Sequence, residues 1–200
     1  MTEKLILLVL AVVGLVISGI RPVDRPTWWL EVLPVIVAVP VLIGTHRRFP
    51  LTPLAYRLIV FHALILVLGA HYTYAQVPLG DWARDAFGLA RNHYDRLGHL
   101  AQGFIPAIVI REVLLRVTPL QPGGWTFLLV TACALSISAL YELGEWWAAA
   151  ALGQAVEAFL GTQGDPWDTQ WDMVLALRGA VTSQFLLGRA HDRALARLRA

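Results

Sequence analysis

Three short motifs place acidic side chains and a histidine next to apolar segments. YDRLGHLAQGF carries Asp95 and His99 four residues apart, and YELGEWWAA carries Glu142 and Glu145 three residues apart. Residues at these spacings share one face of a helix. A third motif, GDPWDTQWDM, contributes Asp165, Asp168 and Asp172. Carboxylates combined with an imidazole suit Zn²⁺, Mn²⁺, Mg²⁺ or Ca²⁺, so the motifs indicate a divalent metal as a candidate cofactor.

The composition indicates the environment in which these motifs lie. Of 200 residues, 57% are hydrophobic and only 15% are charged, whereas about a quarter of the residues in soluble domains are charged. The chain is therefore expected to be an integral membrane protein with a single transmembrane domain over residues 1–200. One cysteine, Cys133, excludes an intrachain disulfide and a CxxC metal site. The basic residues are scattered over loops and ends, which does not favour a nucleic-acid partner.

Apolar stretches of about 20 residues predict an all-α, polytopic bundle of about six transmembrane helices. The expected spans are residues 4–20, 28–44, 57–75, 97–117, 126–152 and 171–189. The first span is interpreted as an anchor because it lacks a clear small-x-small cleavage site. Excess positive charge marks the side expected to be cytoplasmic, with Lys4, Arg47, Arg48, Arg57, Arg116, Arg189, Arg193, Arg197 and Arg199. Both termini then lie in the cytoplasm.

This topology brings the three motifs to one depth. The segments 21–27, 76–96 and 153–170 become outward-facing loops, and the acidic motifs lie just below that outer surface. Most of the tryptophans fall at the same interface, as in an aromatic belt: Trp28, Trp29, Trp82, Trp146, Trp147, Trp167 and Trp171. We therefore predict a multi-pass protein of the bacterial inner membrane with a polar site facing the periplasm.

Roles can be assigned within such a site. The expected metal ligands are His99, Glu142, Asp168 and Asp172. Glu145 and Asp95 are the candidate catalytic residues, and one of them would act as the general base. Arg178 and Gln102 are candidate substrate contacts, because Arg178 could neutralise an anionic head group and Gln102 follows His99 on the same face.

Structural roles are open alternatives for several of these residues. Asp165 precedes a proline and could start a turn, and Asp168 or Asp95 could cap a helix. Arg178 could form an ion pair with Glu142 or Glu145. Further along the fourth span, Arg111 and Glu112 are interpreted as a pair that extends to the cytoplasmic interface.

Together the three motifs resemble the bacterial inner-membrane YjdF family, over nearly the whole chain. They are more loosely similar to the VanZ-like family, which is linked to glycopeptide resistance. The VanZ-like pattern is matched by the Asp95, Arg96 and His99 element, by Glu142, and by Asp168 and Asp172. It is not matched at Glu145, where a glutamine is expected, or at Ala176, where an asparagine is expected. The resemblance implies a role in the envelope or with lipids, but it supplies no reaction.

Three functions fit the sequence. The first is a metal-dependent hydrolase that acts on a membrane lipid or a lipid-linked envelope substrate. The second is an ion-coupled transporter, which a polar path from Glu142 to Arg111 and Glu112 would favour. The third is a non-catalytic scaffold or binding protein in which the acids form a structural ion network.

Overall fold

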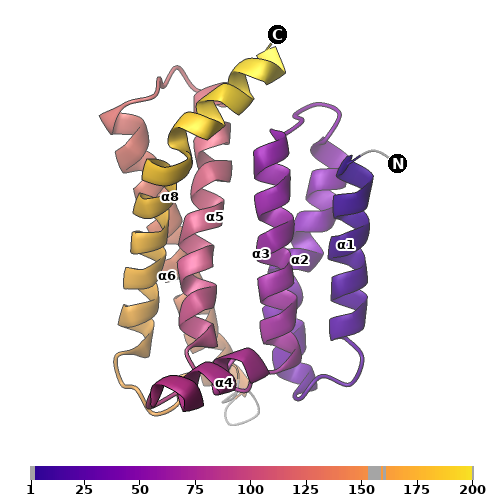
Figure 1. Cartoon of the computed structure of the whole chain (residues 1–200), viewed down its shortest axis with the longest axis vertical. Coiled ribbons are helices and arrows are strands. Elements are labelled where there is room, and N and C mark those ends of the chain that lie inside the picture. Colours follow the sequence, from indigo (N-terminus) through magenta and orange to yellow (C-terminus); the bar gives the residue numbers. More distant parts are fainter. Residues whose placement is uncertain (1–2, 153–158, 160, 200) are drawn as a thin grey trace.

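The computed structural model describes residues 3–152, 159 and 161–199, and these form helices and connecting turns with no strand among them. Six long helices run side by side, and both described ends of the chain lie at the same end of the bundle (Figure 1). The helices are α1 (Glu3–Ser18), α2 (Arg25–Thr45), α3 (Pro53–His71), α4 (Pro78–Phe87), α5 (Tyr94–Val117), α6 (Gly124–Leu152) and α8 (Asp168–Arg199). The all-α prediction is confirmed, whereas the single-domain assignment stays a prediction.

Local sequence signals explain where several helices begin. Asp24 caps α2 by accepting a hydrogen bond from the backbone amide of Thr27 at 2.8 Å. Thr52 caps α3 in the same way through the amide of Ala55 at 3.2 Å. A proline follows each cap within the first turn, where its missing N–H costs no helical hydrogen bond.

Length and apolar composition identify three helices that can cross a membrane: α2, α3 and residues Gly124–Ala151 of α6. α1 is shorter, with 16 residues, and α5 and α8 carry charged side chains along their length. Large apolar side chains nevertheless point outward along all six long helices, including Val16, Val37, Phe61, Val113, Leu140 and Phe185. An apolar outer surface on every long helix fits a membrane bundle, while the number of spans and the side of the termini stay predictions.

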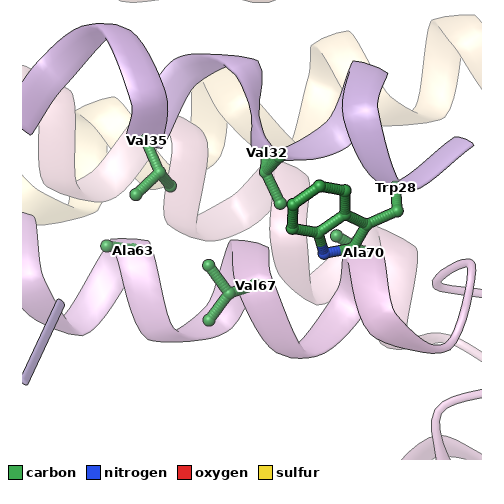
Figure 2. Close-up of a cluster of buried hydrophobic side chains, with 6 residues drawn as sticks. All are labelled: Trp28, Val32, Val35, Ala63, Val67 and Ala70. Carbon is green, nitrogen blue, oxygen red and sulfur yellow. The ribbon is translucent and has the colours of Figure 1, made fainter. Parts of the chain in front are cut away.

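The bundle consists of two halves. α1, α2 and α3 form one half, α5, α6 and α8 form the other, and the main packing between the halves is α3 against α5. Within the first half, Val32 and Val35 of α2 pack against Ala63 and Val67 of α3 (Figure 2). Trp28 belongs to this buried cluster and donates a hydrogen bond to Ser18, so it is not part of an interfacial aromatic belt.

In the second half, glycines bring the backbones of α5 and α8 into direct contact. A Cβ atom at Gly103 would overlap the backbone carbonyl of Ala176, and one at Gly179 would overlap the backbone of Leu100 and Phe104. Small residues at an interface allow this close approach between membrane helices. The contact fixes the register that places the start of α8 beside the start of α5.

A short helix, α4, crosses the end of the bundle within the segment 76–96, which the sequence predicted as an outward-facing loop (Figure 1). It begins at Pro78 and ends at Gly88, which adopts a left-handed conformation with φ of 62°. Leu79, Trp82 and Phe87 are exposed on it. α4 is therefore an amphipathic helix that lies across this end of the bundle.

At the opposite end, the pairing predicted for Arg111 and Glu112 is wrong. Both side chains are buried rather than extended to an interface. Glu112 accepts hydrogen bonds from Thr52 and Arg116 and lies 3.1 Å from Nε2 of His191. Arg111 bonds to Nδ1 of His191 at 2.9 Å and to Asp192 at 2.7 Å. The reason is that α8 continues to Arg199, well past the expected limit of 189, and so supplies both partners.

We expect Gly103→Ala to lower the stability of the protein by about 1–3 kcal/mol, because the added methyl group forces α5 and α8 apart. Thermal unfolding in detergent measures the effect. Gly188→Ala is the matched control on α8, since a Cβ there meets nothing within 4 Å and alanine favours a helix. Equal melting temperatures for the two variants would contradict the close α5–α8 contact.

Candidate functional site

His99 is the centre of the polar cluster, and it is 5% exposed. Its Nε2 atom lies 3.6 Å from Oδ1 of Asp95, one turn earlier on α5, and 3.9 Å from Oδ2 of Asp172 on α8. Its Nδ1 atom lies 3.6 Å from Oε1 of Glu142 on α6. Three helices thus bring to one imidazole the carboxylates that the sequence placed at a common depth.

Gln102 orients the imidazole ring. Its amide oxygen lies 3.2 Å from Nδ1 of His99, and an amide oxygen can only accept a hydrogen bond. A hydrogen on Nδ1 would satisfy this contact, and Nε2 faces Asp95 and Asp172. Tyr141 packs edge-on against the same ring at 6.3 Å between ring centroids.

Two groups of side chains in this cluster could hold a metal ion. One is Asp95, His99 and Asp172, and the other is His99, Glu142 and Glu145. Within each group the potential ligand atoms lie within 4.8 Å of one another. Both groups include His99, whose Nε2 atom faces Asp95 and Asp172 and whose Nδ1 atom faces Glu142.

Glu31 of α2 is a further buried carboxyl that the sequence analysis missed. It lines the same cavity as Asp95, His99 and Glu145, and it accepts a hydrogen bond of 2.8 Å from the hydroxyl of Tyr141. The signal was present as a lone acid inside an apolar segment, but α2 carries no second acid and no histidine that would mark this face as part of a site.

The cluster has far more acid than base. Five carboxyl groups belong to it, those of Glu31, Asp95, Glu142, Glu145 and Asp172. Among the residues that the structure describes, no lysine or arginine lies within ion-pair distance of any of the five, and the sole basic partner is His99. One oxygen of Glu142 and one of Asp172 are also buried without a hydrogen-bond partner.

Asp168 lies beside the cluster but belongs to neither metal group. It pairs with Nη1 of Arg91, a buried side chain that also donates to the carbonyl oxygens of Gly161 and Thr162. Asp165 pairs with Arg96 at 2.6 Å and accepts a hydrogen bond from the amide of Trp167. These two acids thus fix the loop that leads into α8, and Arg91 is a partner that the sequence analysis did not identify.

Arg178 lies apart from the cluster. Its side chain is exposed on α8, and within the described part of the chain it forms no ion pair with Glu142 or Glu145. Position 178 is six residues beyond Asp172, which places it on a different face of the helix. The structure therefore brings together His99, Asp95, Gln102, Glu142, Glu145 and Asp172, and leaves Arg178 outside.

These features define an integral membrane protein with a buried acidic and histidine cluster at one end of a helical bundle. Comparison with known proteins identifies the family of the chain. Residues 3–193 match the model of the family described as "Predicted membrane protein (DUF2238)", and the chain belongs to this family. It is 52% identical over 183 residues to the inner membrane protein YjdF of Escherichia coli strain K12, covering 92% of this chain and 88% of that protein. No solved structure matches the chain.

The relationship confirms the expected YjdF resemblance and an inner-membrane, multi-pass location. The looser VanZ-like similarity is not among the matches, and it stays a sequence-based expectation. The side of the membrane that the cluster faces also stays a prediction.

We expect Arg91→Met to destabilise the protein by about 3–5 kcal/mol, because it leaves the buried Asp168 carboxylate without its partner. Arg84→Met is the control, since Arg84 pairs with Asp81 and Asp85 at the surface and such pairs contribute about 0–1 kcal/mol. Unfolding in detergent gives both values. Adding Asp168→Asn to Arg91→Met should restore part of the loss, and a double variant no more stable than the single one would contradict a direct pairing.

Proposed function

We propose that the protein is an intramembrane, divalent-cation-dependent hydrolase that acts on a lipid or a lipid-linked envelope substrate. The observation that carries the proposal is the excess of buried carboxyl groups around one histidine. An ionised carboxylate inside a membrane protein costs several kcal/mol unless it is compensated. A divalent cation compensates two of them at once.

The contact between Gln102 and Nδ1 of His99 supports one of the two candidate positions. With its hydrogen on Nδ1, the ring offers Nε2 to a cation between Asp95 and Asp172. Gln102 and Glu142 then face the Nδ1–H side, an arrangement that holds metal-ligating histidines in many proteins. Asp172 also has an unpartnered buried oxygen, which a cation would satisfy.

Glu145 is the residue best placed to move a proton. It is buried at the same level, forms no ion pair among the described residues, and lines the cavity that opens beside the cluster. A bound cation would supply Lewis acidity and lower the pKa of a water molecule. Glu145 would accept the proton from that water and return it to the leaving group.

An ion-coupled transporter finds less support. α5 is apolar without interruption from Gly103 to Ile110, between the His99 cluster and the buried pair of Arg111 and Glu112. Ala107 packs there with Val130, Ala134 and Ala180 in a buried apolar cluster. A charged solute that followed α5 would have to cross this layer, and no chain of polar side chains leads through it on that helix.

We expect purified protein to hold close to one divalent cation per chain, measured by elemental mass spectrometry. His99→Ala and Asp172→Asn should lose it, because each removes a ligand. His46→Ala is the control, since this histidine is exposed at the other end of the bundle. Absence of metal from the wild type, together with unstable cluster variants, would overturn the proposal in favour of a structural ion network.

We expect the Glu145→Gln variant to keep the metal. Its rate of hydrolysis should fall by about a hundredfold or more, which is the usual contribution of a general base. The assay measures release of head group or fatty acid from bacterial phospholipids and lipid-linked precursors in mixed micelles. Glu3→Gln serves as control, because Glu3 pairs with Arg57 at the surface. A metal-loaded Glu145→Gln variant with full activity would exclude Glu145 as the base.

A further inference from the structure

A long apolar cavity leads away from the acidic cluster into the bundle. It has a volume of about 670 Å³ and is bounded by α1, α2 and α3 on one side and by α5 and α6 on the other. Asp95, His99 and Glu145 lie at one end of it, and Lys4 and His46 at the other. Cavities of roughly 300–1,000 Å³ are the usual size for a bound small molecule.

The cavity follows the helices through much of the bilayer depth. On α5 its lining runs from Asp95 to Val109, about 20 Å at about 1.5 Å per residue. One leaflet contributes about half of the roughly 30 Å hydrocarbon core, so the cavity extends past the depth of one leaflet. Between its ends the lining is almost entirely apolar, and His62 is the exception.

The side of the cavity between α2 and α6 is closed by few contacts between helices. α3 packs on α5, whereas α2 makes no extensive described contact with α5 or α6. At the level of the acids, the hydrogen bond from Tyr141 to Glu31 joins α6 to α2. Below it, Ala38 of α2 and Ile137 of α6 both line the cavity.

We infer that this cavity binds one acyl chain of a glycerophospholipid, with the phosphate of that lipid at the His99 cluster. The occupant must be apolar over about 20 Å and polar at one end, which describes a lipid and not a soluble metabolite. A carboxylate-rich mouth would repel the phosphate, so the head group position rests on the proposed function, in which a cation lies between Asp95 and Asp172. The chain position rests on the cavity alone.

The surrounding bilayer supplies the lipid directly. The chain belongs to an inner-membrane family, and its long helices expose apolar side chains to the membrane. A lipid entering between α2 and α6 would keep its chain in an apolar environment throughout and bring its head group to the cluster at the same depth. The cavity and the cluster together would therefore select lipids by acyl-chain length as well as by head group.

Native mass spectrometry of delipidated protein tests the chain site. The probes are dipalmitoyl phosphatidylethanolamine, its dihexanoyl analogue and a long-chain polyisoprenyl phosphate. We expect the dipalmitoyl lipid to bind at least about tenfold more tightly than the dihexanoyl lipid, because each buried CH₂ adds to the affinity. Equal affinity of the two, or preferential binding of the polyisoprenyl phosphate, would overturn the assignment.

Variants that fill the cavity give the matched comparison. Ala38→Trp should weaken binding of the dipalmitoyl lipid by at least about tenfold, since the indole occupies space that the chain needs. Val37→Trp, one residue away and exposed on the outer face of α2, should not. Val109→Phe reduces the cavity from the opposite wall and should act like Ala38→Trp, so the test does not depend on one variant folding. Equal binding by all three variants would contradict the chain site.

Metal content measured on the same samples separates the two proposals. If wild-type protein holds no metal but still binds the lipid, and Ala38→Trp weakens that binding, the hydrolase proposal is contradicted and the acyl-chain site is supported. If the protein holds metal but Ala38→Trp and Val109→Phe leave lipid binding unchanged, the acyl-chain site is contradicted and the cation site is supported.

Discussion

The close packing of α5 on α8 is the interaction on which the rest of the structure depends. Gly103 and Gly179 have no side chains to separate the two backbones, and the helices therefore meet without a layer of larger residues between them. This contact sets Asp172 beside His99 near one end and His191 beside Glu112 near the other. One apolar interface thereby positions two polar networks, and neither could form if the helices were a side chain further apart.

The two networks solve the problem of buried charge differently. At the Glu112 end, each charged group has a partner of opposite sign or a hydrogen-bond donor, through Thr52, Arg116 and His191. At the His99 end, acids outnumber bases and two carboxylate oxygens have no partner among the described residues. A balanced network serves structure, whereas an unbalanced one at equal burial requires a ligand or protons. That contrast is the reason for assigning chemistry to one end of the bundle and not to the other.

Much of this arrangement could be predicted from residue types and spacing. Pairs such as Asp95 and His99 reveal a shared helix face by themselves, and apolar segments give the depth at which each face lies. Residues that act alone were harder to place. Glu31 and Arg91 gave no local pattern, because their partners lie more than 70 residues away in the chain. Arg178 was expected in the cluster by depth, but depth does not determine which way a side chain points around the helix axis.

The pairing of α5 with α8 has a consequence for how the protein is made. A chain synthesised from its N-terminus presents α5 to the membrane while α8 is still missing. Until then Arg111 lacks His191 and Asp192, and Arg91 lacks Asp168. These two arginines are therefore compensated only once α8 has been made. A chain that stops before α8 would leave Arg111 and Arg91 without these partners, so α8 is the helix that completes the charge balance of the bundle.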